Sequence, residues 1–170
     1  MNSVLISEPV LIVIDMQAGF PAACDQRTRL AVAREIREAM RLGCPIIFVE
    51  CRNECNDYGP TFPELTGLTA GYEHVAICEK PSNSGADAIA TVCRERGFDP
   101  VYFLACGINT GACVKETVVG LKTLFPDCVI DIIEDACNAV WSGRKDVPRI
   151  FSGIPGVTVT YHSTSNEKGA

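Results

Sequence analysis

Residues 10–17 read VLIVIDMQ, five apolar residues in succession followed by a carboxylate. A run that is apolar at every position, rather than at every second one, is typical of a strand buried on both faces. Similar runs follow at residues 45–49, 75–78, 101–106 and 129–133, and a weaker one at 157–160. Strands of this kind need a helical layer on each side of their sheet. The pattern therefore predicts six strands, mostly parallel, between two layers of helices.

Three segments between the runs have the 3.6-residue periodicity of amphipathic helices. The first segment is capped by Asp25 and ends at Gly43, and its apolar face is formed by Leu30, Ala33, Ile36 and Met40. The second segment covers residues 86–96 and the third covers residues 110–124. The alternation of strands and helices predicts an α/β fold, a Rossmann-like three-layer αβα arrangement.

Composition limits both the domain organisation and the partners. With 170 residues, 47% of them hydrophobic, residues 1–170 are expected to form one domain around one core. The 15 basic and 21 acidic residues give a net charge of -6, and no basic cluster is long enough to follow a phosphate backbone, so we expect no nucleic acid partner. The chain has no apolar run of about 18 residues and no signal-peptide pattern, which predicts a cytoplasmic protein without a membrane partner.

The ten cysteines are expected to be reduced thiols, because most of them lie inside apolar runs, where cysteine acts as a small hydrophobic residue. Residues 53–71, rich in Gly, Pro, Thr and acidic residues, are the longest stretch without clear periodicity. A loop of this length is typical of a lid, a binding loop or an oligomer contact.

Three chemically capable residues follow the predicted strands, at the edge where open parallel sheets bind ligands. Asp15 ends the first run, Lys80 follows the third, and Cys113 lies just after the fourth, in the first turn of a predicted helix. A nearby cation and a helix N-terminus both lower a thiol pKa, so we expect Cys113 to be an activated nucleophile. Asp15 is then suited to carry the proton to a leaving amine.

Each of these residues also has an ordinary interpretation, and other constellations are weaker. Taken singly, Asp15 is a capping carboxylate, Lys80 a solvated side chain and Cys113 a packing residue. A zinc site from Cys51, Cys55 and His74 lacks the paired ligand spacing of structural zinc sites. With only two histidines, the chain offers little for a triad that depends on histidine.

Together the residues resemble the isochorismatase-like superfamily of cysteine hydrolases, which includes nicotinamidases and N-carbamoylsarcosine amidases. The resemblance covers a core at about residues 9–160, and Lys80 followed by Ser84 matches the family's lysine. Its sharpest motifs are D-x-Q-x-x-F at Asp15, Gln17 and Phe20, and G-x-x-T-x-x-C-V-x-x-T at Gly107, Thr110, Cys113, Val114 and Thr117.

The resemblance implies a small-molecule hydrolase that cleaves an amide, ureide or carbamoyl C–N bond through a cysteine thioester. It implies an Asp15-Lys80-Cys113 triad, with Gln17 and Phe20 binding substrate. A cis peptide bond at Ile108–Asn109 is implied as well, with the backbone N–H groups of Asn109 and Cys113 aimed at the developing oxyanion. No metal ion and no cofactor are expected, and the resemblance suggests a homo-oligomer, either a dimer or a tetramer.

The departures from the family pattern leave alternatives open. Metal-binding nicotinamidases have an Asp and His cluster after the second strand, whereas this chain has Glu50-Cys51-Arg52-Asn53. Ser84-Gly85-Ala86 lacks the family's aromatic residue, which predicts a wider or differently shaped pocket. The alternatives are a catalytically idle family member acting as an oligomeric binding or scaffold protein, an isochorismatase-type ether hydrolase, and a thiol redox protein with Cys106 or Cys137 as resolving cysteine.

Overall fold

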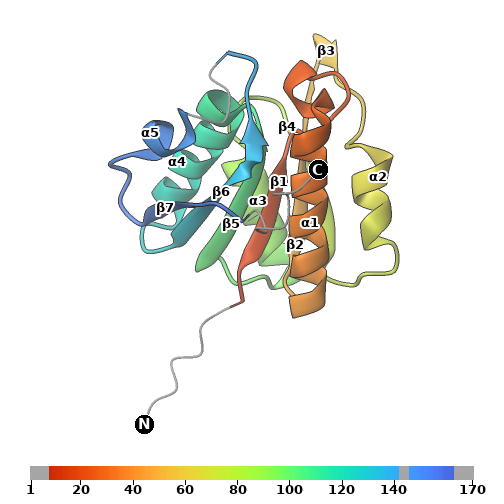
Figure 1. The fold of residues 1–170 in the computed structure, drawn as a ribbon. Helices are drawn as coiled ribbons and strands as arrows, with labels where there is room; N and C mark the ends of the chain where they lie inside the picture. The colour runs from red at the N-terminus through yellow and green to blue at the C-terminus, as the bar shows by residue number, and fades with distance from the viewer. Residues whose placement is uncertain (1–7, 142–145, 163–170) are drawn as a thin grey trace, which may run out of the picture.

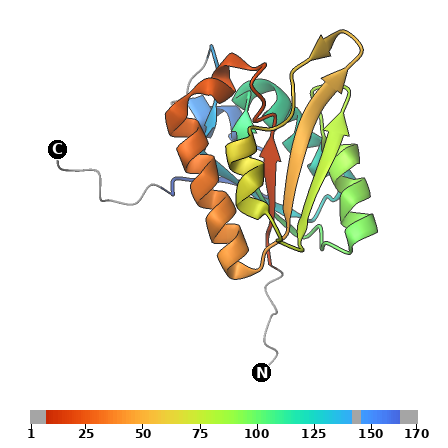
Figure 2. The ribbon, with the colours of Figure 1, turned by 90° about the vertical axis from the view of Figure 1, so that its right-hand side faces the viewer.

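The strands form one sheet in the computed structural model, which describes residues 8–141 and 146–162 (Figures 1 and 2). Six of the described strands run parallel in the order β4-β2-β1-β5-β6-β7, and the short β3 pairs antiparallel with β2. The strands are β1 (Val10–Ile14), β2 (Ile46–Asn53), β3 (Asn56–Asp57), β4 (Val75–Lys80), β5 (Tyr102–Ile108), β6 (Val129–Asn138) and β7 (Val157–Thr160).

Helices cover both faces of the sheet, as Figure 2 shows for the side that carries α1. Apolar side chains of α1 and α2 pack against one face, and those of α3, α4 and α5 pack against the other. The helical elements are η1 (Pro21–Cys24), α1 (Gln26–Leu42), α2 (Pro63–Thr66), η2 (Gly67–Thr69), α3 (Ala86–Arg96), η3 (Thr110–Val114), α4 (Lys115–Leu124) and α5 (Val147–Phe151). No described helix is both long and apolar enough to span a membrane.

The predicted three-layer α/β fold with six parallel strands is confirmed, and the differences lie in local detail. Leu30 was predicted on the buried face of α1 but is 62% exposed, because the face that packs on the sheet is centred on Val32 and Ile36. The edge strand β4 is only half-buried, with Ile77 at 56% exposure, since no further described strand covers it. The predicted helix at residues 110–124 begins as a π-helical turn, η3, before α4.

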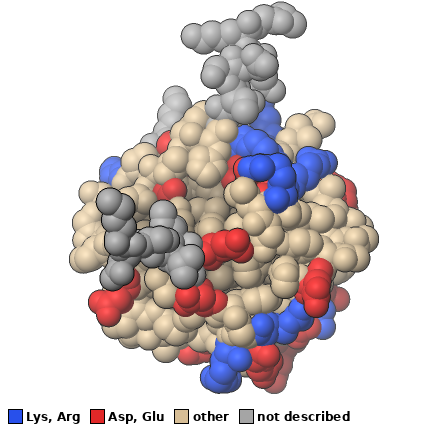
Figure 3. Space-filling model, turned by 90° about the horizontal axis from the view of Figure 1, so that it is seen from below, with Lys and Arg blue, Asp and Glu red and all other residues tan. Residues whose placement is uncertain are grey.

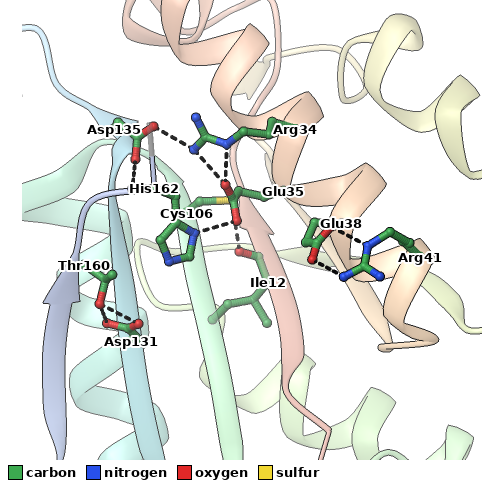
Figure 4. A network of polar contacts seen from close by, with 10 residues as sticks. All are labelled: Ile12, Arg34, Glu35, Glu38, Arg41, Cys106, Asp131, Asp135, Thr160 and His162. Atoms are coloured by element: carbon green, nitrogen blue, oxygen red, sulfur yellow. Dashed lines mark hydrogen bonds and ion pairs between the residues drawn. The ribbon is translucent and has the colours of Figure 1, made fainter. Parts of the chain in front are cut away.

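A polar network fastens α1 to the sheet (Figure 4). The guanidinium of Arg34 contacts both Glu35 at 2.7 Å and Asp135 of β6 at 2.6 Å. His162, after β7, places its Nδ1 2.9 Å from Glu35 and donates its backbone N–H to Asp135. The two buried carboxylates are therefore held by partners from two segments, α1 and the residues after β7, as buried charges require.

The topology brings the ends of β1 and β5 together. These two strands are neighbours in the sheet, but β1 leads through α1 to β2 on one side while β5 leads through α4 to β6 on the other. A point where neighbouring strands diverge in this way leaves a crevice at their carboxyl ends, and ligands of open α/β sheets bind there. The loop after β1 and the turn after β5 both line this crevice.

Gly107 makes the close approach of the two strand ends possible. It pairs with Ile14 in the sheet register and has a φ of +119°. A Cβ at this position would lie 2.1 Å from the Ile14 carbonyl oxygen and 2.7 Å from its nitrogen. Backbone atoms of a central strand cannot move aside, so only glycine fits here. The contact sets the positions of Asp15 and of the turn that carries Cys113.

We expect Gly107→Ala to lower the free energy of unfolding by at least about 2 kcal/mol, because the substitution adds both a steric clash and an unfavourable backbone conformation. Gly67→Ala is the matched control. Gly67 has a φ of -61° and open space around its Cβ position. That variant should be neutral or more stable by up to about 1 kcal/mol. Urea unfolding midpoints measure both effects, and equal midpoints would contradict the packing argument.

Candidate active site

Asp15, Lys80 and Cys113 come together at the carboxyl edge of the sheet. The Nζ of Lys80 lies 2.9 Å from the Oδ2 of Asp15, and the two side chains are 1% and 0% exposed. The thiol of Cys113 is within hydrogen-bonding reach of the Asp15 carboxylate. A buried cation, a buried carboxylate and a buried thiol thus interact directly, although they come from three distant parts of the chain.

The Asp15 carboxylate is held in an environment that raises its pKa. Its backbone has a φ of +52°, an uncommon conformation for a residue other than glycine that Asp and Asn tolerate best. Burial raises the pKa of Asp15 above its ordinary value of 3.8, although the Coulombic attraction of Lys80 opposes this effect. The group is therefore well suited to accept a proton.

Lys80 is charged in spite of its burial. Burial by itself lowers its pKa, but the nearby Asp15 and Cys113 outweigh that effect and raise the pKa above the ordinary value. The ammonium also donates to the carbonyl oxygen of Ser82 at 2.9 Å. Gly85 provides room for the side chain, because a Cβ there would lie 3.2 Å from the Lys80 Cδ.

Cys113 corrects one expectation from the sequence. Lys80 and the start of the helix were expected to lower its pKa, but burial and the Asp15 carboxylate raise the pKa of Cys113 to about 12. The attraction of Lys80 and of the Asn109 N–H is the smaller effect, because the positive charge of Lys80 is already balanced by Asp15. Cys113 is therefore a protonated thiol at rest.

The turn that carries Cys113 begins at a cis peptide bond between Ile108 and Asn109. The backbone N–H of Asn109 is directed at the Cys113 sulfur. Next to the turn lies a cavity of about 330 Å³, lined on the other side by the end of β6 and the residues after it. Its lining residues are Asn109, Gly111, Ala112, Ala139, Val140 and Trp141.

Gln17 was expected to bind substrate, and the structure places it in a different contact. Its side chain is 1% exposed. The amide oxygen accepts from the Cys51 N–H at 2.7 Å, and the amide nitrogen donates to the carbonyl oxygens of Cys51 and Gly59. These contacts hold the end of β2, at Cys51, and the residue Gly59 after β3 against the loop after β1. Gln17 therefore positions the wall of the crevice in this structure.

Phe20, the other residue expected at the pocket wall, is half-buried and stacks on Tyr58. The two ring centroids are 4.0 Å apart, with an angle of 13° between the planes. Tyr58 comes from the predicted loop at residues 53–71, which contains β3, α2 and η2. Sequence analysis did not single out Tyr58, because nothing in the sequence indicates which loop residue folds back onto Phe20.

Asn83, on the loop after β4, is a second residue that the sequence did not indicate. Its Oδ1 lies 3.8 Å from the Cys113 sulfur, and its Nδ2 donates to Glu116 at 2.9 Å. Helices α3 and α4 also approach closely at this end, since a Cβ at Gly120 would lie 2.7 Å from that of Ala86. The small residues Ala86 and Gly120 thus allow close packing of the two helices.

The structure places the alternative cysteine residues differently. Cys106 is buried on the sheet face opposite Cys113, whereas Cys137 is buried in the same core cluster as Cys113, so its role as a resolving cysteine stays a prediction. His74 precedes β4 at the amino end of the sheet, whereas Cys51 lies near the carboxyl end of β2. Within residues 8–141 and 146–162, no group of three or more His, Cys, Asp or Glu side chains is placed to hold a metal ion.

A doubly wound sheet with a buried carboxylate, ammonium and thiol at its carboxyl edge defines a class of α/β proteins with a cysteine-centred site. The chain belongs to the isochorismatase family, because the model of the isochorismatase domain matches residues 9–146. No curated protein sequence gives a significant match.

Solved structures share the fold at low sequence identity. The nicotinamidase of Staphylococcus aureus is 16% identical with a TM-score of 0.76, covering 91% of this chain and 98% of its own. The N-carbamoylsarcosine amidase of Thermoplasma acidophilum is 20% identical with a TM-score of 0.69, covering 93% and 99%. The MAR1 ribonuclease of Caenorhabditis elegans is 21% identical with a TM-score of 0.73, covering 91% and 77%.

We expect Asp15→Asn to accelerate alkylation of Cys113 by iodoacetamide at pH 7 by about tenfold or more. Without the carboxylate, the charge of Lys80 is balanced only when Cys113 ionises, so the thiol pKa falls from its raised value of about 12. Asparagine also tolerates the positive φ of this position. Peptide mass mapping measures the rate, and Cys113→Ala gives the background from other thiols. An unchanged or slower rate would show that Asp15 does not control the thiol.

Gln17→Ala is expected to lower the free energy of unfolding by about 1–3 kcal/mol, because buried backbone groups at Cys51 and Gly59 lose their partners. It should also increase proteolytic cleavage within residues 52–60. The exposed Gln26, at the start of α1, provides the matched control Gln26→Ala. If both variants show the same cleavage pattern as the wild type, Gln17 does not anchor the segment.

Proposed function

We propose that the protein is a cysteine-dependent hydrolase that cleaves the C–N bond of a small amide, ureide or carbamoyl compound. The observation that carries this proposal is the buried Asp15–Lys80 ion pair next to the Cys113 thiol. A carboxylate with a raised pKa in contact with a buried thiol provides both a proton acceptor and a nucleophile.

The first half of the reaction forms a thioester. Cys113 Sγ attacks the substrate carbonyl carbon while its proton moves to Asp15, because a thiol with a pKa of about 12 is hardly ionised beforehand. Lys80 remains charged and stabilises the negative charge as it moves from Asp15 to the sulfur. The backbone N–H groups of Asn109 and Cys113 are the proposed donors to the oxyanion. Asp15 then returns the proton to the nitrogen, the C–N bond breaks and the amine leaves.

The second half releases the acid. A water molecule attacks the thioester carbonyl carbon while Asp15 takes a proton from it. The C–S bond breaks, the proton returns to the sulfur, and Cys113 is again a thiol. The products are one amine or ammonia and one carboxylic or carbamic acid for each water consumed. Asp15 thus carries a proton in both halves, which requires that its ionised and protonated forms are close in energy.

The comparisons support this type of reaction. Two of the structural neighbours are named as amidases, a nicotinamidase and an N-carbamoylsarcosine amidase. A third is named as a ribonuclease, which shows that the fold alone does not determine the substrate. A polyanionic substrate fits this chain poorly, since its net charge is -6. Figure 3 shows the opposite end of the molecule, at the amino ends of the strands, where both acidic and basic side chains occur.

A catalytically idle binding protein is the second candidate. It is favoured by the 5% exposure of Cys113 together with the raised pKa of its thiol. A structural thiol has both properties, whereas a nucleophile must be reached by its substrate. The two candidates differ in whether Cys113 is acylated by any amide.

We expect the wild-type protein to release ammonia from at least one member of a panel of nicotinamide, N-carbamoylsarcosine, simple primary amides and ureides. Hydroxylamine should divert the thioester to a hydroxamate, and Cys113→Ala should lower turnover by at least about 1,000-fold. Because Asp15 must be ionised to accept the proton and its pKa is raised above 3.8, kcat/KM should fall with decreasing pH while still above pH 3.8. No ammonia from any compound would favour the idle protein, and equal activity in Cys113→Ala would show that Cys113 is not the nucleophile.

A further inference from the structure

Asn83 lies at the mouth of the site, between Cys113 and solvent. Its side chain is exposed, whereas Cys113 beneath it is only 5% exposed. The Oδ1 of Asn83 is 3.8 Å from the Cys113 sulfur. A molecule that reaches the sulfur past this loop therefore meets the Asn83 amide as it arrives.

Glu116 determines which end of that amide faces the sulfur. A carboxylate has no proton to donate, so the Asn83 group that lies 2.9 Å from its Oε1 must be the NH₂ end. The carbonyl oxygen of Asn83 is then left facing Cys113. Glu116 lies three residues after Cys113 at the start of α4, so the nucleophile and the residue that orients Asn83 belong to adjacent turns of one helical segment.

A fixed acceptor beside the nucleophile selects for a donor on the substrate. When Cys113 bonds to the carbonyl carbon, the scissile nitrogen lies next to the sulfur, within reach of an acceptor 3.8 Å from that sulfur. A hydrogen bond from this nitrogen to Oδ1 would stop rotation about the C–N bond. The nitrogen lone pair could then be held toward Asp15, which must protonate it before the amine leaves.

We propose that Asn83, oriented by Glu116, accepts a hydrogen bond from the scissile nitrogen, and that the substrates are amides or ureides with at least one N–H on that nitrogen. This inference rests on the proposed C–N hydrolysis and adds a specificity-determining residue to it. It predicts discrimination against tertiary amides and a smaller role for Asn83 when the leaving atom is oxygen.

The test compares three compounds with the same acyl group: nicotinamide, N,N-dimethylnicotinamide and methyl nicotinate, or the same three derivatives of whichever acyl group the wild type prefers. The proteins are the wild type, Asn83→Ala, Glu116→Gln and the control Glu95→Gln, which changes an exposed glutamate on α3. The measurement is kcat/KM for each compound.

Asn83→Ala should lower kcat/KM for the primary amide by about 10- to 100-fold and leave the ester within about twofold. Glu116→Gln should lower the ratio of kcat/KM for the amide to kcat/KM for the ester by a smaller factor. Glutamine in place of the carboxylate allows the Asn83 side-chain amide to rotate and exchange its two ends. Glu95→Gln should change neither value.

An equal fall for amide and ester in Asn83→Ala would overturn the proposal, since Asn83 would then only hold Cys113 in place. So would a wild type that cleaves the tertiary amide as fast as the primary one. If the wild type cleaves neither amide nor ester, the proposed hydrolysis itself has failed and this inference fails with it. The two failures are therefore distinguishable.

Discussion

The buried ion pair between Asp15 and Lys80 is the interaction on which the site depends. Removing a charged group from water costs several kcal/mol. Loss of one partner of a buried ion pair lowers the free energy of unfolding by about 3–5 kcal/mol, so each of these two side chains needs an opposite charge beside it. The pair joins the end of β1 to the end of β4, two strands that are not neighbours in the sheet. The loops around it must therefore close over both groups, and this burial sets the electrostatics of everything nearby.

The Asp15–Lys80 pair also explains why Cys113, the proposed nucleophile, is a thiol at rest. A free lysine next to Cys113 would favour the thiolate, but a lysine already balanced by a carboxylate has little attraction left for a second anion. Two anions and one cation in a buried space cannot all be charged at low cost. The proton therefore stays on Cys113 at rest, and the proposed catalysis depends on moving it to Asp15.

Three contacts between distant parts of the chain hold the loops around the Asp15–Lys80 pair. Gly107 lets β1 and β5 touch at their ends, Gln17 fastens the end of β2, and Tyr58 stacks on Phe20. Each contact joins parts of the chain that are far apart in sequence. Lys80 ends strand β4, Asp15 directly follows β1 and Cys113 lies in the η3 turn, while the loop after β4 supplies Asn83 next to Cys113.

The sequence by itself determined the layers of the fold, because buried strands and amphipathic helices leave a local pattern of apolar residues. It also indicated that Asp15, Lys80 and Cys113 lie at the same edge of the sheet, because all three follow strand ends. It could not show that Leu30 faces solvent or that the Gln17 side chain forms hydrogen bonds with backbone groups. Nor could it show that Tyr58 stacks on Phe20 or that Asn83 lies beside Cys113. The pKa of Cys113 was likewise decided only by the tertiary structure. Burial and charge balance are sums over residues distant in sequence, so no local pattern contains them.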